Sequence, residues 1–250
     1  MTKAINRRRF LGSAFALSAG GIFVPRIVRG QFSSPGVIAN AEAVPPFTPD
    51  YATGFETSGV EPGWFDFGTT PQNNWDGTPA LTGAFSLIQT GQTAAFYAYQ
   101  DVYTGASEMY AAFEMEINAA PNSSMTFFRF MNSGSSTRCS FTMGTNRTIT
   151  CFPTGGGTSP ATAAMPIATK FWVKCRYKPE TAPGNGEAEV WATANIGAGW
   201  GTGQGDSTGA DADLVAQNGF MLLSAITPAT VTKYDQFKRN TTDIPASAYS

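Results

Sequence analysis

Alternation of apolar and polar residues with a period of two is the feature that most constrains how this 250-residue chain can fold. In residues 109–117, Met109 and Phe113 share one face of an extended segment, and Glu114 and Glu116 share the other. Successive side chains of a strand point to opposite faces, so the pattern predicts a strand with one face in a core. No segment has the spacing of a long amphipathic helix. The chain is therefore expected to be all-β.

Short strands separated by frequent turns are indicated along most of the chain. Clusters of Gly, Asn, Ser and Pro interrupt the alternating runs about every ten residues, the spacing expected of an all-β sandwich. Besides residues 109–117, strands are predicted at 125–131, 138–143, 147–152, 171–177, 187–193, 219–225 and 231–238. The segments 171–177 and 187–193 are expected to pair as a hairpin, whereas the Gly- and Asp-rich residues 194–212 are expected to form a loop.

Residues 1–30 resemble a bacterial export signal of the twin-arginine (Tat) type. The sequence NRRRFLG at residues 6–12 contains the Arg7-Arg8 pair, and an apolar run of about fifteen residues follows. That run is shorter than the roughly twenty residues that span a bilayer, so cleavage is favoured over a retained membrane anchor. Small residues place the cut after Gly30, with Ala41 and Ala43 as alternatives. The resemblance implies export to the periplasm, the cell surface or the extracellular space.

Removal of such a signal changes the charge of the chain. The whole sequence has 16 basic and 18 acidic residues, but residues 1–30 carry six of the basic ones and no acid, so the mature chain has a net charge of −8. Nucleic acids bind clustered Lys and Arg, and no such cluster remains outside the signal. Neither nucleic acid nor, after signal removal, a membrane is expected as a partner.

A spacer and one folded domain are expected after the signal. Residues 31–50 are rich in Pro, Ala and Ser and have no periodic apolar pattern, which is typical of an extended linker. Residues 51–250 have the length of one domain. Charged residues make up only 14% of the chain, a composition that favours a secreted β-rich protein. The sequence has no internal repeat and leaves the oligomeric state open.

The chain contains no histidine. A Ser-His-Asp or Cys-His nucleophile, a His-ligated zinc ion and a His general base are therefore excluded. Carboxylate chemistry remains, and Glu114 and Glu116 on one strand face are its best candidates, since retaining glycosidases use two carboxyl groups about 5 Å apart. The next outward position is Asn118, which cannot act as an acid. Two solvated glutamates are the alternative interpretation.

The order of segments resembles that of concanavalin A-like, laminin G-type jelly-roll domains. The resemblance rests on GFETSGVEPGW (54–64), NWDGTPALTGAFSL (74–87), the strand pair at 110–130, the segments FWVKCRY and GNGEAEVWA, and YDQFKRN (234–240). It implies a β-sandwich of two antiparallel sheets, in which the late aromatic-Asp-x-aromatic strand pairs near the first strand. Glu114-x-Glu116 is similar to part of the carboxylate signature of laminarinase-type glycosidases, whereas lyases of this fold usually carry a histidine. Lectins and adhesion modules share the fold, so it does not by itself choose a function.

The predicted hairpin 171–177/187–193 presents a row of aromatic and charged residues on its outward face. The row consists of Trp172, Lys174, Arg176, Glu189 and Trp191, with Glu187 beside them. Tryptophan faces stack on sugar rings, and charged groups hydrogen-bond sugar hydroxyls, so the row predicts a glycan-binding platform. Plain cross-strand stabilisation and burial under a loop are the alternatives.

Three cysteines form a second group of candidates. Cys139 and Cys151 are equally far from Thr145, the centre of a predicted hairpin turn. A simple hairpin sets them opposite each other, close enough for a disulfide, and leaves Cys175 unpaired. Strand alternation puts all three on the same face as apolar neighbours, so three buried thiols are the alternative.

The loop GDSTGADAD contains Asp206, Asp211 and Asp213. Clustered carboxylates and free backbone carbonyls coordinate calcium, so one interpretation is a calcium site. The spacing matches no EF-hand loop, and solvated loop aspartates are the other interpretation. No other cofactor is expected.

Together these features favour an exported, non-catalytic domain that binds a polysaccharide, a surface glycan or another cell-surface partner. A carbohydrate-active enzyme using Glu114 and Glu116 is the first alternative. The second is a self-associating structural protein, favoured by the low charge and the high Gly, Thr and Ala content. The sequence leaves open whether the chain is an enzyme and which glycan it binds.

Overall fold

The computed structural model describes residues 47–57, 59–67, 73–90, 96–209, 211–222 and 230–249. The chain divides into residues 1–46 and a compact unit, Phe47–Ser250. The predicted signal peptide and most of the predicted spacer lie outside the described residues. The described part contains fourteen strands and two short 3₁₀ helices, η1 (Ile196–Ala198) and η2 (Ala246–Tyr249), and within it there is no α-helix.

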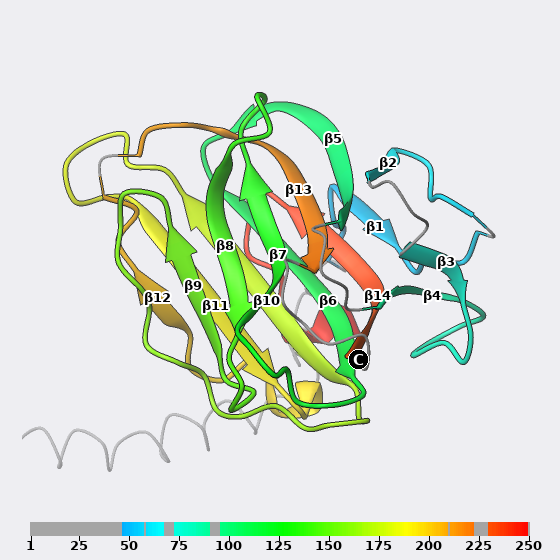
Figure 1. Cartoon of the computed structure of the whole chain (residues 1–250). Coiled ribbons are helices and arrows are strands. Elements are labelled where there is room, and N and C mark those ends of the chain that lie inside the picture. Colours follow the sequence, from blue (N-terminus) through cyan, green and yellow to red (C-terminus); the bar gives the residue numbers. More distant parts are fainter. Residues whose placement is uncertain are drawn as a thin grey trace, which may run out of the picture. The chain divides into compact units, whose positions relative to one another are not determined.

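Eight strands form the larger sheet, called sheet A (Figure 1). Its main path runs in the order β12 (Gln204–Asp206), β11 (Glu187–Thr193), β10 (Phe171–Lys178), β6 (Met109–Ile117), β14 (Val231–Asn240), β4 (Ser86–Thr90) and β3 (Asn73–Gly77). Beside this path, β1 (Tyr51–Thr53) pairs with β14. All of these pairs are antiparallel.

Six strands form sheet B. Their order is β2 (Trp64–Phe67), β5 (Phe96–Ala106), β13 (Val215–Leu222), β7 (Met125–Met131), β8 (Thr137–Met143) and β9 (Ile149–Pro153), again with antiparallel pairing. Figure 1 shows β7, β8 and β9 as one layer in front of β10 and β11. The two sheets therefore form a sandwich.

The core fills the space between the sheets with alternate residues from each strand. Phe113 on β6 and Phe220 on β13 are both fully buried, and their rings meet edge to face with centres 4.9 Å apart. The ring of Tyr234 on β14 lies 4.2 Å from that of Phe220. Such aromatic pairs contribute about 0.5–1.5 kcal/mol beyond their area burial. The alternating pattern of the sequence thus places one face of each central strand in a shared core.

The predicted strands are confirmed over most of the chain, and the fold is the expected sandwich of two antiparallel sheets. β6, β7 and β11 have the predicted bounds, and β10 and β11 form the predicted hairpin. Tyr51 on β1 lies opposite Arg239 on β14, so the late strand pairs with the first as the resemblance implies.

Two local predictions are wrong. Part of the predicted loop 194–212 forms η1 and β12, and β12 extends sheet A beyond β11. In the β8–β9 hairpin, Cys139 lies opposite Pro153 and Phe141 opposite Cys151, so the two cysteines do not face each other. The turn is longer than the predicted residues 144–146: Gly144 N–H donates to the Thr148 carbonyl at 2.9 Å, and Arg147 within the turn has a left-handed backbone (φ 68°).

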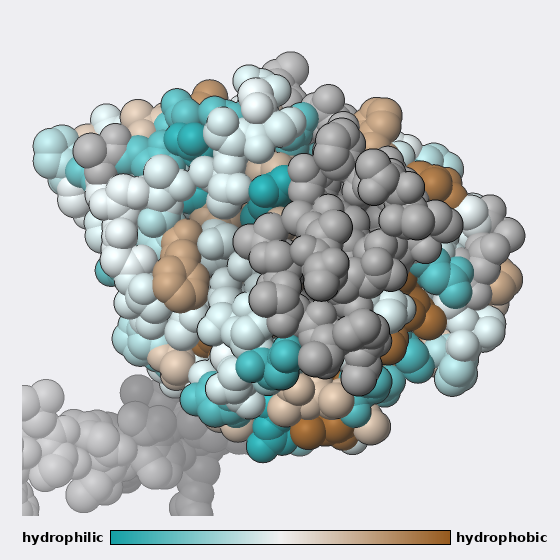
Figure 2. Space-filling view, in the orientation of Figure 1, coloured by the Kyte–Doolittle hydropathy of each residue, from teal (hydrophilic) through white to brown (hydrophobic). Residues whose placement is uncertain are grey.

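The surface is mostly hydrophilic on the side seen in Figure 2. Among the coloured atoms, teal and pale residues predominate and hydrophobic ones occur in separate small groups. Large hydrophobic side chains exposed in the described part include Phe65, Phe152 and Leu214, which come from separate elements. Scattered exposure of this kind is ordinary for a folded domain and does not mark a binding site.

Candidate binding surface on sheet A

The outward face of sheet A carries the row of residues predicted as a platform. On β10, Trp172, Lys174 and Arg176 point away from the core, because the intervening Val173 and Cys175 are fully buried between the sheets. The hairpin register then sets the two β11 members of the row, Glu189 and Trp191, opposite Arg176 and Lys174 respectively. The structure therefore brings all five residues together on one face.

Arg176 is the centre of an ionic network. Its Nε donates a hydrogen bond to Glu108 at 2.7 Å, and its Nη1 lies 2.6 Å from Glu187 and 3.5 Å from Glu189. Glu108 also accepts a hydrogen bond from the Tyr110 hydroxyl at 2.9 Å. Burial raises the pKa of the Glu189 carboxyl, and the positive charge of Arg176 opposes this shift. One guanidinium thus orients three carboxylates whose other oxygens can accept hydrogen bonds.

Two hollows border this network. One has a volume of about 430 Å³ and is lined by Arg176, Gly184, Gly186, Glu187, Ala188, Glu189, Gly205, Asp206 and Ser207. The other has a volume of about 520 Å³ and is lined by Asp50, Gly105, Ala106, Ser107, Glu108, Met109, Arg239 and Thr241. Arg176 lines the first, Glu108 lines the second, and the two side chains form an ion pair. The hollows are therefore neighbours on the surface, each in the size range of small-ligand sites.

Lys174 is almost completely buried, unlike Arg176. Its Nζ lies 2.7 Å from the Asp243 carboxylate and 4.2 Å and 5.3 Å from the ring centres of Trp191 and Trp200. Only 4% of the Lys174 side chain is exposed, against 62% of the Asp243 side chain. A buried ammonium needs such partners to keep its charge. The hairpin pattern could not reveal them, because Trp200 and Asp243 belong to distant segments without strand periodicity.

Residues 241–249, called the C-terminal segment, cover this part of the face. Ile244 is fully buried in a small apolar cluster with Ala112 and Trp200, and its carbonyl accepts a hydrogen bond of 2.8 Å from Trp200 Nε1. The Tyr249 ring lies 3.7 Å from Lys238 Nζ and meets the Trp200 ring edge to face. The predicted row is thus open at the Arg176 end and covered at the Lys174 end.

The two tryptophans of the row are only partly exposed. Beside Trp191 the backbone passes at Gly203, where a Cβ would lie 2.6 Å from the indole, so glycine is required for this close approach. Trp172 has Lys170 Nζ 5.3 Å from its ring centre. Its own Nε1 is buried and has no hydrogen-bond partner among the described residues. Neither ring is therefore a freely exposed platform in this structure.

Glu114 and Glu116 differ in environment although they share a strand face. Glu114 is buried, where its Oε2 accepts a hydrogen bond of 2.6 Å from the Thr82 hydroxyl and its Oε1 lies 3.3 Å from Lys170 Nζ. Glu116 is partly exposed and forms an ion pair of 3.3 Å with Lys233. Each carboxylate is thus held by its own partners.

Asp235 on β14 lies opposite Glu114 on β6 and is a carboxylate that the sequence identified only as part of the closing strand. It is fully buried and accepts hydrogen bonds from the Thr82 N–H, the Ser86 hydroxyl and the Gln236 N–H at 2.7–2.9 Å. Burial raises the pKa of Asp235 to about 6, against the effect of these hydrogen bonds. The sequence alone does not place Asp235 beside Glu114, because this contact depends on the register between β6 and β14.

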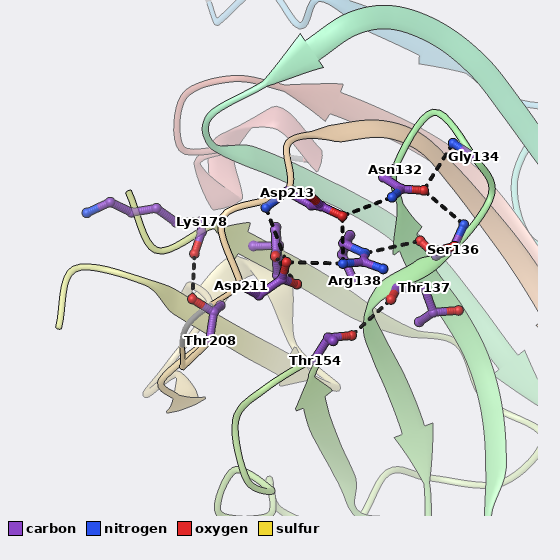
Figure 3. A network of polar contacts seen from close by, with 11 residues as sticks. Asn132, Gly134, Ser136, Thr137, Arg138, Thr154, Lys178, Thr208, Asp211 and Asp213 are labelled. Carbon is purple, nitrogen blue, oxygen red and sulfur yellow. Dashed lines mark hydrogen bonds and ion pairs between the residues drawn. The ribbon is translucent and has the colours of Figure 1, made fainter. Parts of the chain in front are cut away.

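Asp211 and Asp213 hold Arg138 (Figure 3). The Arg138 Nη1 lies 3.1 Å from Asp211 and 2.8 Å from Asp213, and Asn132 donates a further hydrogen bond to Asp213. Asp211 also accepts a hydrogen bond of 2.7 Å from the hydroxyl of Tyr177, whose pKa is raised by burial and by this acceptor. The two aspartates therefore fasten the loop before β13 to β8 and β10.

Asp206 stands apart, at the end of β12, where its Oδ1 accepts a hydrogen bond from the Ser207 N–H. In the described ranges no three Cys, Asp or Glu side chains are grouped in a way that could hold a metal ion. A calcium site at Asp206, Asp211 and Asp213 stays a prediction.

All three cysteines are buried free thiols. Burial raises the pKa of Cys139 and of Cys175, whereas a hydrogen bond from Cys139 lowers the pKa of Cys151. The Cys151 Sγ also approaches the Gln204 carbonyl at 3.8 Å. A disulfide between Cys139 and Cys151 stays a prediction, without the opposed register on which it was based.

Comparisons with known proteins bear on the fold. No protein-family model matches the chain, and no curated protein matches it. Solved structures do: Cip1, a cellulose-induced protein, has a TM-score of 0.57 and 12% identity over 78% of this chain and 99% of that one. A sialidase has a TM-score of 0.51 and 9% identity over 72% of this chain. The receptor-binding domain of botulinum neurotoxin type G has a TM-score of 0.50 and 9% identity over 81% of this chain.

This chain spans 17% of the sialidase chain and 50% of the toxin chain, so each match covers only part of the other protein. At such identities the similarity concerns the fold alone. Within the described residues no helix is long and apolar enough to cross a membrane. The compact unit of this chain is a jelly-roll β-sandwich of two antiparallel sheets.

Proposed function

We propose that the chain is an exported, non-catalytic carbohydrate-binding domain that binds a polysaccharide or surface glycan at the Arg176 end of sheet A. The observation that carries the proposal is the pair of hollows whose linings are connected by the Arg176–Glu108 ion pair. A polymer of sugar rings needs neighbouring sites of this kind rather than one deep pocket.

The chemistry of the first hollow suits sugar hydroxyls. Glu187 and Glu189 provide oriented acceptors, and Arg176 provides donors. The hollow also contains Asp206, so it combines one cation with three anions. This balance favours a neutral glycan over an acidic one at this end of the face.

Variants of the first hollow test the proposal. Glu187→Ala removes a half-exposed acceptor, and Ser207→Trp fills the hollow while all its charged residues remain. Loss of one charge-assisted hydrogen bond weakens binding about tenfold. Both variants are expected to weaken retention on whichever neutral polysaccharide the mature chain binds. Glu56→Gln, a loss of one charge in a loop outside the hollow, is the matched control; unchanged retention by all three would rule out this site.

Export by the Tat route is a second part of the proposal. The support is the Arg7-Arg8 sequence and the apolar run behind it. An exported domain meets polysaccharides outside the cytoplasm, which agrees with the proposed ligand class.

A further inference from the structure

The C-terminal segment, called the cover below, lies over the Lys174 end of the same sheet face and has no role in the proposed glycan site. Past Asn240 the C-terminal segment pairs with no strand of the described part. It is held by side chains instead: the Ile244 contacts, the Asp243–Lys174 ion pair and the Tyr249–Lys238 contact. A segment held this way can leave without breaking a sheet.

Lysines and carboxylates both lie beneath the C-terminal segment. Lys170, Lys174 and Lys238 approach this area, where the described sheet residues place Glu114, which pairs with Lys170, and Asp235 opposite Glu114. Burial lowers the pKa of Lys238. The counter-charge of Lys174 comes from Asp243 on the cover.

The C-terminal segment contacts the sheet face with the kinds of chemical group that a bound ligand would present. Asp243 brings a carboxylate to a buried ammonium, the Ile244 carbonyl accepts from the indole N–H of Trp200, and the Tyr249 ring lies against the ammonium of Lys238. The match is incomplete, because the Trp172 Nε1 and the Tyr249 hydroxyl are buried without hydrogen-bond partners in the described part of the chain. A better acceptor than the cover could satisfy Trp172.

We infer that the C-terminal segment occupies a second binding site, formed by Trp172, Lys174, Trp200 and Lys238, whose ligand is a carboxylated saccharide that displaces the segment. A uronate ring carries the same groups as the cover: a carboxylate for Lys174, hydroxyl acceptors for the indole N–H groups, and a ring surface. This inference rests on the proposed function, since it extends the glycan site of sheet A from the Arg176 end, where a neutral glycan is proposed to bind, to the Lys174 end.

Binding of trigalacturonate to the full mature chain tests the inference, with its methyl ester as the uncharged control ligand. Asp243→Ala frees Lys174 for the ligand carboxylate, so at least tenfold tighter binding of trigalacturonate is expected, with no gain for the ester. Adding Lys174→Met should abolish the gain. Glu56→Gln, which removes one negative charge elsewhere, should bind as the unaltered chain does. Hydrogen exchange of residues 241–249 should accelerate when trigalacturonate binds.

Tyr249→Ala removes the contact with Lys238 at the other end of the cover. We expect this variant to bind trigalacturonate several-fold more tightly than the unaltered chain does. Equal gains for the acid and the ester, or no gain in either variant, would overturn the inference. If the unaltered chain still binds a neutral polysaccharide in that case, the proposed function stands. If neither the chain nor its variants bind any saccharide, both fail.

Discussion

The environments of single residues on the sheet A face depend on partners that are distant in the sequence, and Asp235 is the clearest example. Its pKa of about 6 lies above the ordinary value of 3.8, mainly because it is buried. Between these values the folded chain binds more protons than the unfolded chain, so the free energy of unfolding falls as pH rises from 4 to 6. Above pH 6 this stabilising contribution is absent.

Asp235→Asn tests this at the residue scale. The variant lacks the titrating group, so its free energy of unfolding should decline less than that of the unaltered chain between pH 4 and pH 7. Urea unfolding at several pH values measures the difference. Parallel pH profiles would show that Asp235 does not titrate in this range.

The three thiols give a second residue-scale prediction. All three cysteines are fully buried, and a hydrogen bond from Cys139 lowers the pKa of Cys151. Native protein should therefore react slowly with an alkylating reagent, with Cys151 modified first, and all three should react in denaturant. Detection of only one reactive thiol in denatured, unreduced protein, with Cys175 as the modified residue, would instead establish the Cys139–Cys151 disulfide.

At the scale of elements, the loop before β13 is fastened to two strands by Asp211. Tyr177→Phe removes a buried hydrogen bond to this carboxylate and should lower the free energy of unfolding by about 1–2 kcal/mol. Asp213→Asn should cost less, because half of the Asp213 side chain is exposed and its ion pair is screened. Urea unfolding of both variants checks the order. A larger loss in Asp213→Asn would contradict the assignment of Asp211 as the main attachment.

Individual elements also show what could be predicted from the sequence. The bounds of β6, β7 and β11 follow from clean alternation. β13 begins at Val215, earlier than predicted, because the buried polar residues Gln217 and Asn218 break its apolar pattern. β12 consists of Gln-Gly-Asp, which has no alternation to detect. Buried polar groups and glycine therefore conceal strands that tertiary pairing stabilises.

At the scale of the whole molecule, the orientation of the platform residues was predictable and their burial was not. Parity alone puts Lys174 and Arg176 on one face. The cover reaches Lys174 from residues 241–249, a non-periodic segment whose position depends on Trp200. Sequence patterns act over neighbouring residues, whereas this contact joins segments that only the folded sandwich brings together.

Export is a whole-molecule property that the Arg7-Arg8 pair should control. Replacing both with lysine is expected to leave the precursor inside the cell with its first thirty residues uncleaved, because the pair is the recognised part of a Tat signal. Immunoblotting of cell fractions measures this. Arg26→Lys, outside the pair, is the control, and unchanged export of the double variant would contradict a Tat signal.

Glycan binding without catalysis can be tested in a single incubation experiment. The mature chain beginning at Gln31 is incubated with a panel of insoluble neutral and acidic polysaccharides, with calcium and with chelator, and each supernatant is assayed for released sugar ends. We expect retention on at least one neutral polysaccharide with no release of sugar ends. Release of sugar ends, or no retention on any polysaccharide, would contradict it.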